Sequence, residues 1–379
     1  MNLKHISCVR KGNVFGADHT EDEARVSGPT LRRINGGPGN SDWMLYRSIH
    51  AGNHPTQPSY SHVSRAVLNE SGLWEKRGAV LVADQDYEFG GRWNAAGCED
   101  PRVQYIKELG VSVLAYCAGT FNGPRVAVAI SNDEGLTWRK LGLLRFPDNP
   151  ELEEWDNKNA LFLPRSVRSP SGVRSFAIVH RPKPSMIRMP GFKGGIDDVD
   201  DAMLIPPKDR PSMYIGYVPV DALTDITALT NIREVRPLFT PADIPWEPAA
   251  QVGVGAGSQF LEVPGLGFLT AYHGVHCRDY VKGVLMPGTG RYDLSHWGGL
   301  LVFHPEEPHN VLAVGGPCMF PETPEELGDP TAPDAHLFST KVVFPTHIEL
   351  QSPTQILIWY GAGDQAVATA LLTLQEPIV

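Results

Sequence analysis

Cysteine is scarce in this sequence, and the few cysteines are scattered. There are 5 among 379 residues, an odd number with no C-x-x-C spacing: Cys8, Cys98, Cys117, Cys277 and Cys318. A disulfide framework or a structural zinc site would show paired or closely spaced cysteines. We therefore expect no metal and no bound cofactor.

Positive charge is also in deficit. Lys and Arg number 33 against 43 Asp and Glu, which gives a formal net charge of −10. Affinity for nucleic acid comes mainly from Lys and Arg that neutralise phosphates, so this balance disfavours nucleic acid as a partner. A neutral or small ligand fits the composition better.

Long apolar runs are missing as well. No run approaches the length of a membrane span, and residues 1–16 hold no apolar segment of a secretory signal. The expectation is a cytoplasmic, reduced protein that engages no membrane. An exported homologue trimmed of its signal is the alternative, and a homo-oligomer is compatible with the sequence.

Turn formers, in contrast, are abundant. The chain has 38 Gly and 33 Pro beside an apolar content of 42%, which is too high for a disordered polymer. Short apolar or alternating runs, typical of strands, lie at 111–120, 124–131, 173–181, 213–220, 268–275, 299–304, 310–316, 341–345 and 355–364. No long helical pattern separates them, which argues against parallel βαβ units. We predict an all-β protein, with residues 1–379 forming one domain.

One turn has a specific signature. Residues 131–138 fit the Asp-box pattern S-x-D-x-G-x-T-W, in which Asp and Gly shape a tight turn and Trp packs beneath it. A strand-like run leads directly into the turn. Asp boxes lie between outer strands of β-propeller blades, and a propeller leaves a central channel where a sugar could bind.

Two stretches are predicted to be loop insertions in this scaffold. Residues 183–212 are rich in Pro and Gly and carry the acidic run 197–201, and residues 305–335 are rich in Pro, Glu and Asp. Long loops of this kind line or cover a site, or are simply solvated.

Residues 97–103 (GCEDPRV) carry the clearest candidate chemistry. Glu99 and Asp100 are adjacent carboxylates, and strand alternation would place Arg102 on the same side as Asp100. A neighbouring guanidinium lowers the pKa of a carboxyl group, whereas an acid catalyst needs the reverse. From the residues alone, a structural ion pair is the better interpretation.

The same stretch resembles the signature of glycoside hydrolase family 130, the β-mannoside phosphorylases and β-mannosidases. Further segments resemble the motifs of that family in the same order along the chain: 44–47 (MLYR), 63–65 (VSR), 157–164 (NKNALFLP), 180–182 (HRP), 246–255 (WE to GVG), 272–275 (YHGV), 343–346 (VFPT) and 359–364 (WYGAGD).

The resemblance implies a five-bladed β-propeller with the active site in its central funnel. It also implies an inverting reaction at a β-mannoside oligosaccharide, with Asp100 as general acid acting directly or through a mannose hydroxyl. The substrate-binding residues it implies are Arg47, Arg65, Glu99, Arg102, Asn159, Tyr272, His273 and Asp364. Lys158 and Arg181 would hold inorganic phosphate as a co-substrate in a phosphorylase.

The pattern departs from the family at Gln251, where phosphorylases carry Lys. A dianionic phosphate needs several fixed cations, so the phosphate site is weakened. An inverting hydrolase instead needs a second carboxylate roughly 6.5–9.5 Å from the acid. Glu247, Glu262 and Asp156 are candidates, and Glu247 is the one we select.

We therefore favour a hydrolase in which water is the nucleophile. A β-mannoside phosphorylase that releases mannose 1-phosphate is the alternative, and a non-catalytic carbohydrate-binding propeller is a further one. A sialidase is disfavoured because only one Asp box is present.

Overall fold

Antiparallel strands account for nearly all the regular structure, which confirms the all-β prediction. The computed structural model describes residues 3, 6–16, 25–32, 42–54, 57–89, 95–120, 122–183, 206–277, 280–281, 284–285, 294–331 and 340–378. Within these ranges the strands form five antiparallel units of four strands each, apart from a few short extra strands.

The first two units share one sheet because β4 and β6 pair in parallel through residues 59–61 and 95–97. The first unit comprises β2 (Arg25–Arg32), β3 (Trp43–His54), β4 (Gln57–Leu68) and β5 (Trp74–Leu81). The second comprises β6 (Ala95–Ile106), β7 (Val111–Thr120), β8 (Gly123–Ser131) and β9 (Arg139–Leu143).

The remaining units are separate sheets. The third comprises β10 (Asp156–Arg168), β11 (Arg174–Lys183), β12 (Met213–Pro219) and β13 (Arg233–Phe239). The fourth comprises β14 (Gln251–Ala256), β16 (Gly267–Cys277), β19 (Leu294–Phe303) and β20 (Val311–Met319), with β15 (Leu261–Val263) paired to β16. The fifth comprises β21 (Val343–Ser352), β22 (Gln355–Ala362), β23 (Ala366–Leu374) and, from the other end of the chain, β1 (Ile6–Gly16).

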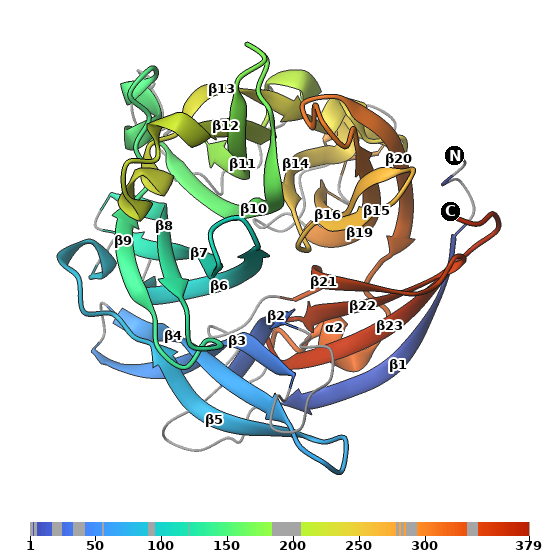
Figure 1. Ribbon diagram of the computed structural model, residues 1–379. Coiled ribbons are helices and arrows are strands. Elements are labelled where there is room, and N and C mark those ends of the chain that lie inside the picture. The colour runs from blue at the N-terminus through green and yellow to red at the C-terminus, as the bar shows by residue number, and fades with distance from the viewer. Residues whose placement is uncertain are drawn as a thin grey trace.

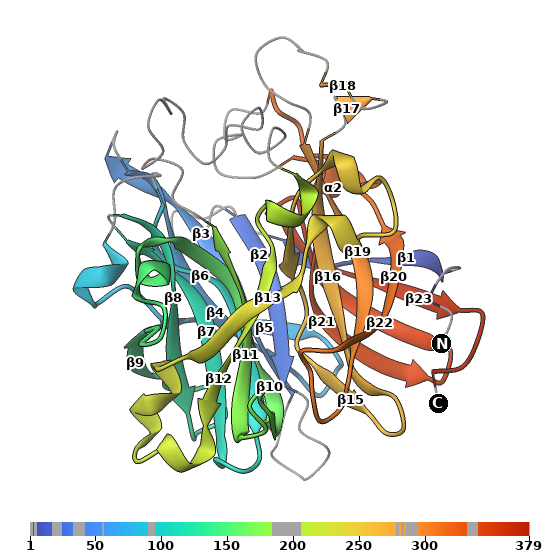
Figure 2. The same cartoon turned by 90° about the horizontal axis from the view of Figure 1, so that it is seen from above.

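The units follow one another around a common centre (Figure 1). The strands nearest the common centre contact one another from each unit to the next. The contacting pairs are β2 and β6, β6 and β10, β10 and β14, β16 and β21, and β21 and β2. Figure 2 shows the ring from the side, with the short pair β17 (Tyr280–Val281) and β18 (Val284–Leu285) beyond one end of it.

Five apolar clusters lie between consecutive units, so each interface has its own core. Phe162 and Ile178 of the third unit pack with Val128 of the second, and Trp359 of the fifth packs with Tyr46 of the first. Full burial of such a side chain contributes roughly 1.5–3 kcal/mol. Interfaces of this kind stabilise the ring without a helix layer.

Among the residues that the structure describes, helical structure is confined to short pieces. One α-helical turn, α2 (Pro324–Leu327), precedes the fifth unit. Seven 3₁₀ helices lie in the described connections: Asp86–Glu88, Pro150–Glu154, Pro207–Asp209, Val220–Ala222, Ile226–Thr230, Pro241–Asp243 and Pro248–Ala250. None of the described helices has the length and apolar character that crossing a membrane requires.

The Asp box forms the predicted turn between β8 and β9, the outer strands of the second unit. One carboxylate oxygen of Asp133 accepts hydrogen bonds from the Ser131 hydroxyl at 2.7 Å and the Thr137 backbone N–H at 3.0 Å. Trp138 donates from its ring to the Gly135 carbonyl at 3.2 Å and packs edge-on against Trp43 of the first unit. The turn therefore has a structural role.

The two predicted insertions have different outcomes. Most of 183–212 lies outside the described residues. The stretch 305–331 is not a simple loop, because 311–319 form β20, which pairs with β19, and 324–327 form α2. The apolar run 310–316 forms most of β20, which is the last strand of the fourth sheet, so this stretch belongs to the scaffold.

Every unit carries a β-bulge in its first strand. The register shifts between residues 27 and 30, 99 and 102, 158 and 161, 251 and 253, and 345 and 347. A bulge re-aims side chains and often lies next to an active site. Several candidate site residues lie in these bulges.

Candidate active site

Two adjacent carboxylates on β6 share one guanidinium. Arg47, from β3, donates from Nη2 to Glu99 Oε1 at 3.0 Å and from Nη1 to Asp100 Oδ1 at 3.4 Å. Its Nε donates to Ser61 Oγ at 2.9 Å, which fixes the guanidinium against β4. The Arg47 and Asp100 side chains are 15% and 12% exposed, so both reach a surface that a ligand could touch.

Asp100 lies in the β6 bulge in the left-handed region, with φ at 48°. Glu99 pairs with Cys117, and Arg102 pairs with Ala115. From one pair to the next, β6 advances by three residues and β7 by two, so β6 has one extra residue. Strict alternation therefore fails between these residues, so the strand period cannot place Asp100 and Arg102 on one side. Their charges still interact. A non-glycine residue with positive φ is strained, and such strain concentrates at functional sites.

Gly97 allows β6 to approach β4 this closely. Its φ is 106°, and a Cβ there would lie 2.1 Å from the Ser61 carbonyl oxygen. No side chain fits unless the backbone moves. The carboxylate pair two residues later depends on this contact for its position.

We expect Gly97→Ala to lower the free energy of unfolding by about 2 kcal/mol or more and to reduce activity, because backbone strain and a steric clash combine. Urea denaturation and turnover measure the two effects. Gly110→Ala is the matched control, since Gly110 also has positive φ, 67°, but no atom lies within 4 Å of its added Cβ. Equal losses in the two variants would contradict a role for the β4–β6 contact.

The carboxylates of the pair have opposite pKa shifts. Burial, with Asp100 adding repulsion, raises the pKa of Glu99 against the attraction of Arg47. Burial alone would raise the pKa of Asp100 too, but the cations Arg47, Lys158, Arg102 and Arg181 together hold it below its ordinary value. Of the two carboxyl groups, Glu99 therefore keeps its proton to higher pH than Asp100 does.

Two further cations lie side by side on the third unit. Lys158 of β10 and Arg181 of β11 are cross-strand partners. Burial lowers the pKa of Arg181 to about 10 despite the attraction of Asp100. Its Nε is buried without a hydrogen-bond partner, and neither cation forms an ion pair with a carboxylate among the described residues.

Asn159 follows Lys158 in the β10 bulge with φ at 56°, matching the place of Asp100 in β6. Its Oδ1 is buried and unpartnered, and it lies beside His273 against Gly255, where a Cβ would meet His273 Cε1 at 2.6 Å and Asn159 Oδ1 at 3.0 Å. Gly255 is therefore needed for this close packing.

His273 of β16 connects these groups. Arg181 Nη1 lies 3.5 Å from His273 Nε2, so Arg181 donates and the imidazole proton is assigned to Nδ1, which has no partner. Burial, together with the nearby cations, lowers the pKa of His273 well below its ordinary value, which keeps the ring neutral.

Arg102 and Asp364 also belong to this central cluster. Arg102 is almost fully buried, donates to the Gly257 carbonyl at 2.6 Å and lies over the Phe344 ring, so it acts on the site through charge. Asp364 follows β22 with φ at 56°, and its carboxylate, with Glu99 and Asp100, raises the pKa of Arg47 against the effect of burial.

The structure does not bring Arg65 to the cluster. Its guanidinium lies over Trp43 and donates to the Glu134 carbonyl at 3.4 Å, at the Asp box. Arg65 is four residues beyond Ser61 on β4, or roughly 13 Å at the usual strand rise.

Tyr272 and Glu247 also lie elsewhere. The Tyr272 side chain is fully buried between Phe239 and Trp246 in an apolar cluster. The Glu247 carboxylate is 68% exposed and accepts from His276 Nε2 at 2.7 Å. Glu247 therefore has no described contact with the Asp100 cluster.

The other candidate bases have partners of their own. Glu262 pairs with Arg165 at 2.8 Å on an exposed surface, and Asp156 pairs with Arg125 at 3.4 Å. Gln251, at the position that departs from the family pattern, is completely buried and contacts the Trp246 carbonyl at 3.5 Å.

A repeat that we did not identify in the sequence organises the cluster. The second strand of each unit carries a buried ring, Tyr46, Tyr116, His180, Tyr272 or Tyr360. The residue that follows each ring is Arg47, Cys117, Arg181, His273 or Gly361. The ring packs in the core, and in the first four units the next residue joins the central electrostatic network. The sequence signal that could have revealed this repeat is an aromatic or His residue followed by a small or polar residue in the second strand of each unit.

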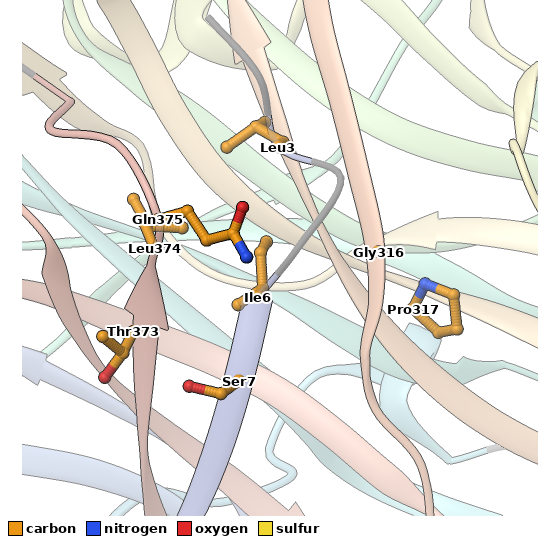
Figure 3. Close-up of a pocket in the computed structure, with 8 residues that line it drawn as sticks. All are labelled: Leu3, Ile6, Ser7, Gly316, Pro317, Thr373, Leu374 and Gln375. Carbon is orange, nitrogen blue, oxygen red and sulfur yellow. The ribbon is translucent and has the colours of Figure 1, made fainter.

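A cavity of about 540 Å³ lies away from this cluster, between the ends of β1, β20 and β23 (Figure 3). Its lining is Leu3, Ile6, Ser7, Gly316, Pro317, Thr373, Leu374 and Gln375, with no charged side chain among them. It holds no catalytic set.

No family model and no curated protein matches this sequence, but solved structures match it closely in fold. A β-1,2-mannobiose phosphorylase from Listeria innocua, bound to β-1,2-mannobiose, is 15% identical, with 97% of each chain covered and a TM-score of 0.63. A structure described with the GH130 family of mannoside phosphorylases, said to contain hydrolases that target β-1,2-mannosidic linkages in Candida mannan, is 15% identical, with 98% and 94% covered and a TM-score of 0.64.

The mannose phosphorylase MPT-4 from Leishmania mexicana, in complex with phosphate ion, is 12% identical, with 97% and 88% covered and a TM-score of 0.55. The chain therefore has the fold of these mannoside-active proteins. The resemblance to glycoside hydrolase family 130 drawn from the motifs is confirmed at the level of the fold.

Proposed function

We propose that this protein is a five-bladed β-propeller enzyme that cleaves β-mannosidic bonds at the centre of its ring. The five units, their cyclic contacts and the five interfacial cores support the propeller. The motifs and the fold together support the β-mannoside as substrate.

Asp100 is the proton donor in this proposal. Arg47 holds the Asp100 carboxylate within hydrogen-bond reach while leaving part of it exposed. As the glycosidic C–O bond breaks, the leaving oxygen takes the proton of Asp100, directly or through a mannose hydroxyl. Inversion at the anomeric carbon then requires the nucleophile to attack from the opposite face.

Inorganic phosphate fits the site as nucleophile better than water does, and one observation carries this choice. Arg181 is a buried guanidinium with an unpartnered Nε, its cross-strand neighbour is Lys158, and no described carboxylate pairs with either. Buried cations that no carboxylate contacts directly are a site for an anion. We therefore move from the hydrolase favoured on sequence grounds to the phosphorylase.

Phosphate would also prepare the acid. Lys158 and Arg181 are two of the four cations that hold the pKa of Asp100 low. A bound dianion offsets their charge, so the pKa of Asp100 rises and its protonated form becomes more populated. Binding of the nucleophile and protonation of the acid then favour each other.

The test is incubation with β-1,2-mannobiose and with β-1,4-mannobiose, with and without phosphate. A phosphate oxygen bonds to the anomeric carbon, so we expect α-mannose 1-phosphate and mannose in equal amounts, and product only when phosphate is present. Mannose release at the same rate with and without phosphate would establish hydrolysis. Sugar binding with no turnover under either condition would establish a non-catalytic protein.

A further inference from the structure

His296 lies beside His273 and was not singled out by any motif. In the register of β16 and β19, Val275 pairs with His296 and His273 pairs with Gly298. His273 and His296 are therefore diagonal neighbours on one face of the sheet. Their rings are 5.8 Å apart with an interplanar angle of 34°.

The backbone of His296 is fixed from the fifth unit. Its N–H donates to the Lys341 carbonyl at 2.9 Å, and it forms an isolated bridge with Val342. The imidazole therefore lies at the seam between the fourth and fifth units and next to the central cluster. Such a fixed position favours a binding role, because little conformational freedom is lost when a ligand arrives.

Three neighbouring side chains keep buried polar atoms without partners. They are Nδ1 of His296, Nδ1 of His273 and Nε of Arg181. A single buried polar atom without a partner is uncommon in a folded protein and asks for an explanation. Three of them within one electrostatic network indicate a ligand that accepts hydrogen bonds.

Lys158 and Arg181 both act on His296. Burial and the repulsion of these two cations lower the pKa of His296 to about 4, so the ring is neutral near pH 7. A neutral imidazole offers one N–H donor and adds no further positive charge to the site. An arriving anion offsets the two cations and strengthens that donor.

We infer that His296 is a ligand of the anion that attacks the sugar and that its imidazole donates a hydrogen bond to this anion beside Arg181 and His273. The inference rests on the proposed phosphorolysis. It adds a residue of β19 to the anion site, close enough to Arg181 and Lys158 for both cations to lower the pKa of its imidazole. His296 would thereby compensate in part for Gln251.

The experiment compares the parent with His296→Asn in phosphate-dependent cleavage. Loss of a charge-assisted hydrogen bond should raise the KM for phosphate about tenfold or more, and weaken competitive inhibition by sulfate to a similar degree. The KM for the mannoside should stay within about twofold, because His296 is proposed to contact only the anion. A residue with only a structural role would instead change the KM for both substrates. His309→Ala is the control, since His309 packs on Tyr217 away from the cluster.

An unchanged KM for phosphate in a folded His296→Asn protein would overturn the inference. If that variant does not fold, a phosphate-soaked crystal of the parent decides, because an anion beyond hydrogen-bond distance of His296 overturns it equally. If the parent cleaves mannosides without phosphate, the proposed phosphorolysis fails. Calorimetric binding of sulfate to the parent and to the variant then still tests the anion site alone.

Discussion

Asp100→Asn lowers the turnover of a β-mannoside by about 10²-fold or more and leaves the protein folded. An amide keeps the shape of the carboxyl group but has no acidic proton to deliver, and general acid catalysis contributes at least about this factor. Initial rates with β-1,2-mannobiose measure the loss, and circular dichroism checks the fold.

Asp148→Asn is the matched control. Asp148 is a half-exposed carboxylate paired with Arg233 at 3.0 Å on the outer surface. We expect its replacement to leave turnover unchanged. Asp100→Asn activity close to that of the parent would remove Asp100 from the mechanism.

Arg47→Leu removes the cation that Glu99 and Asp100 share. Two carboxylates in a largely buried site would lose their counter-ion, so the free energy of unfolding should fall by about 3 kcal/mol and activity should be lost. Urea denaturation at pH 7 measures the stability change. The matched control, Arg145→Leu, removes an exposed pair with Glu153 and should cost about 1 kcal/mol or less.

The stability difference between Arg47→Leu and the parent should shrink as pH falls. In the parent, the lowered pKa of Asp100 contributes stability that is present above the pKa of the unfolded carboxyl group and is lost as pH falls through the folded value. The variant lacks most of that contribution at every pH. A difference that does not change as pH falls from 5 to 2 would show that Arg47 stabilises the fold by packing rather than by charge.

Strands with a continuous apolar pattern were predictable from the sequence, and weakly patterned ones were not. The run at 111–120 coincides with β7, and the run at 268–275 lies within β16. The outer strands β9 and β13 were not found, because their side chains are mostly exposed or half-buried and carry little apolar periodicity. Strand β6 was not among the predicted apolar runs, and the alternation expected for residues 100–102 fails at its bulge.

The candidate site was predictable to the level of motifs but not of individual side chains. Asp100, Lys158, Arg181 and His273 are brought into one cluster as expected. Arg65 and Tyr272 also lie in matching motifs, but one is farther along its strand and the other is turned into the core. Sequence gives the order of residues along a strand, whereas bulges and packing decide which side chain reaches the centre.

The pairing of a buried ring with the residue after it separates architecture from chemistry within each unit. The ring at position 46, 116, 272 or 360 packs in a core between neighbouring units, and the ring at position 180 stacks on Phe146. The adjacent position carries a charge, a thiol, an imidazole or no side chain at all. Exchanges at the first four adjacent positions can thus change what the centre binds, whereas at Gly361 an added Cβ would lie 2.5 Å from Ser27 Oγ of the neighbouring unit. A scaffold built in this way can diversify its ligands by single substitutions.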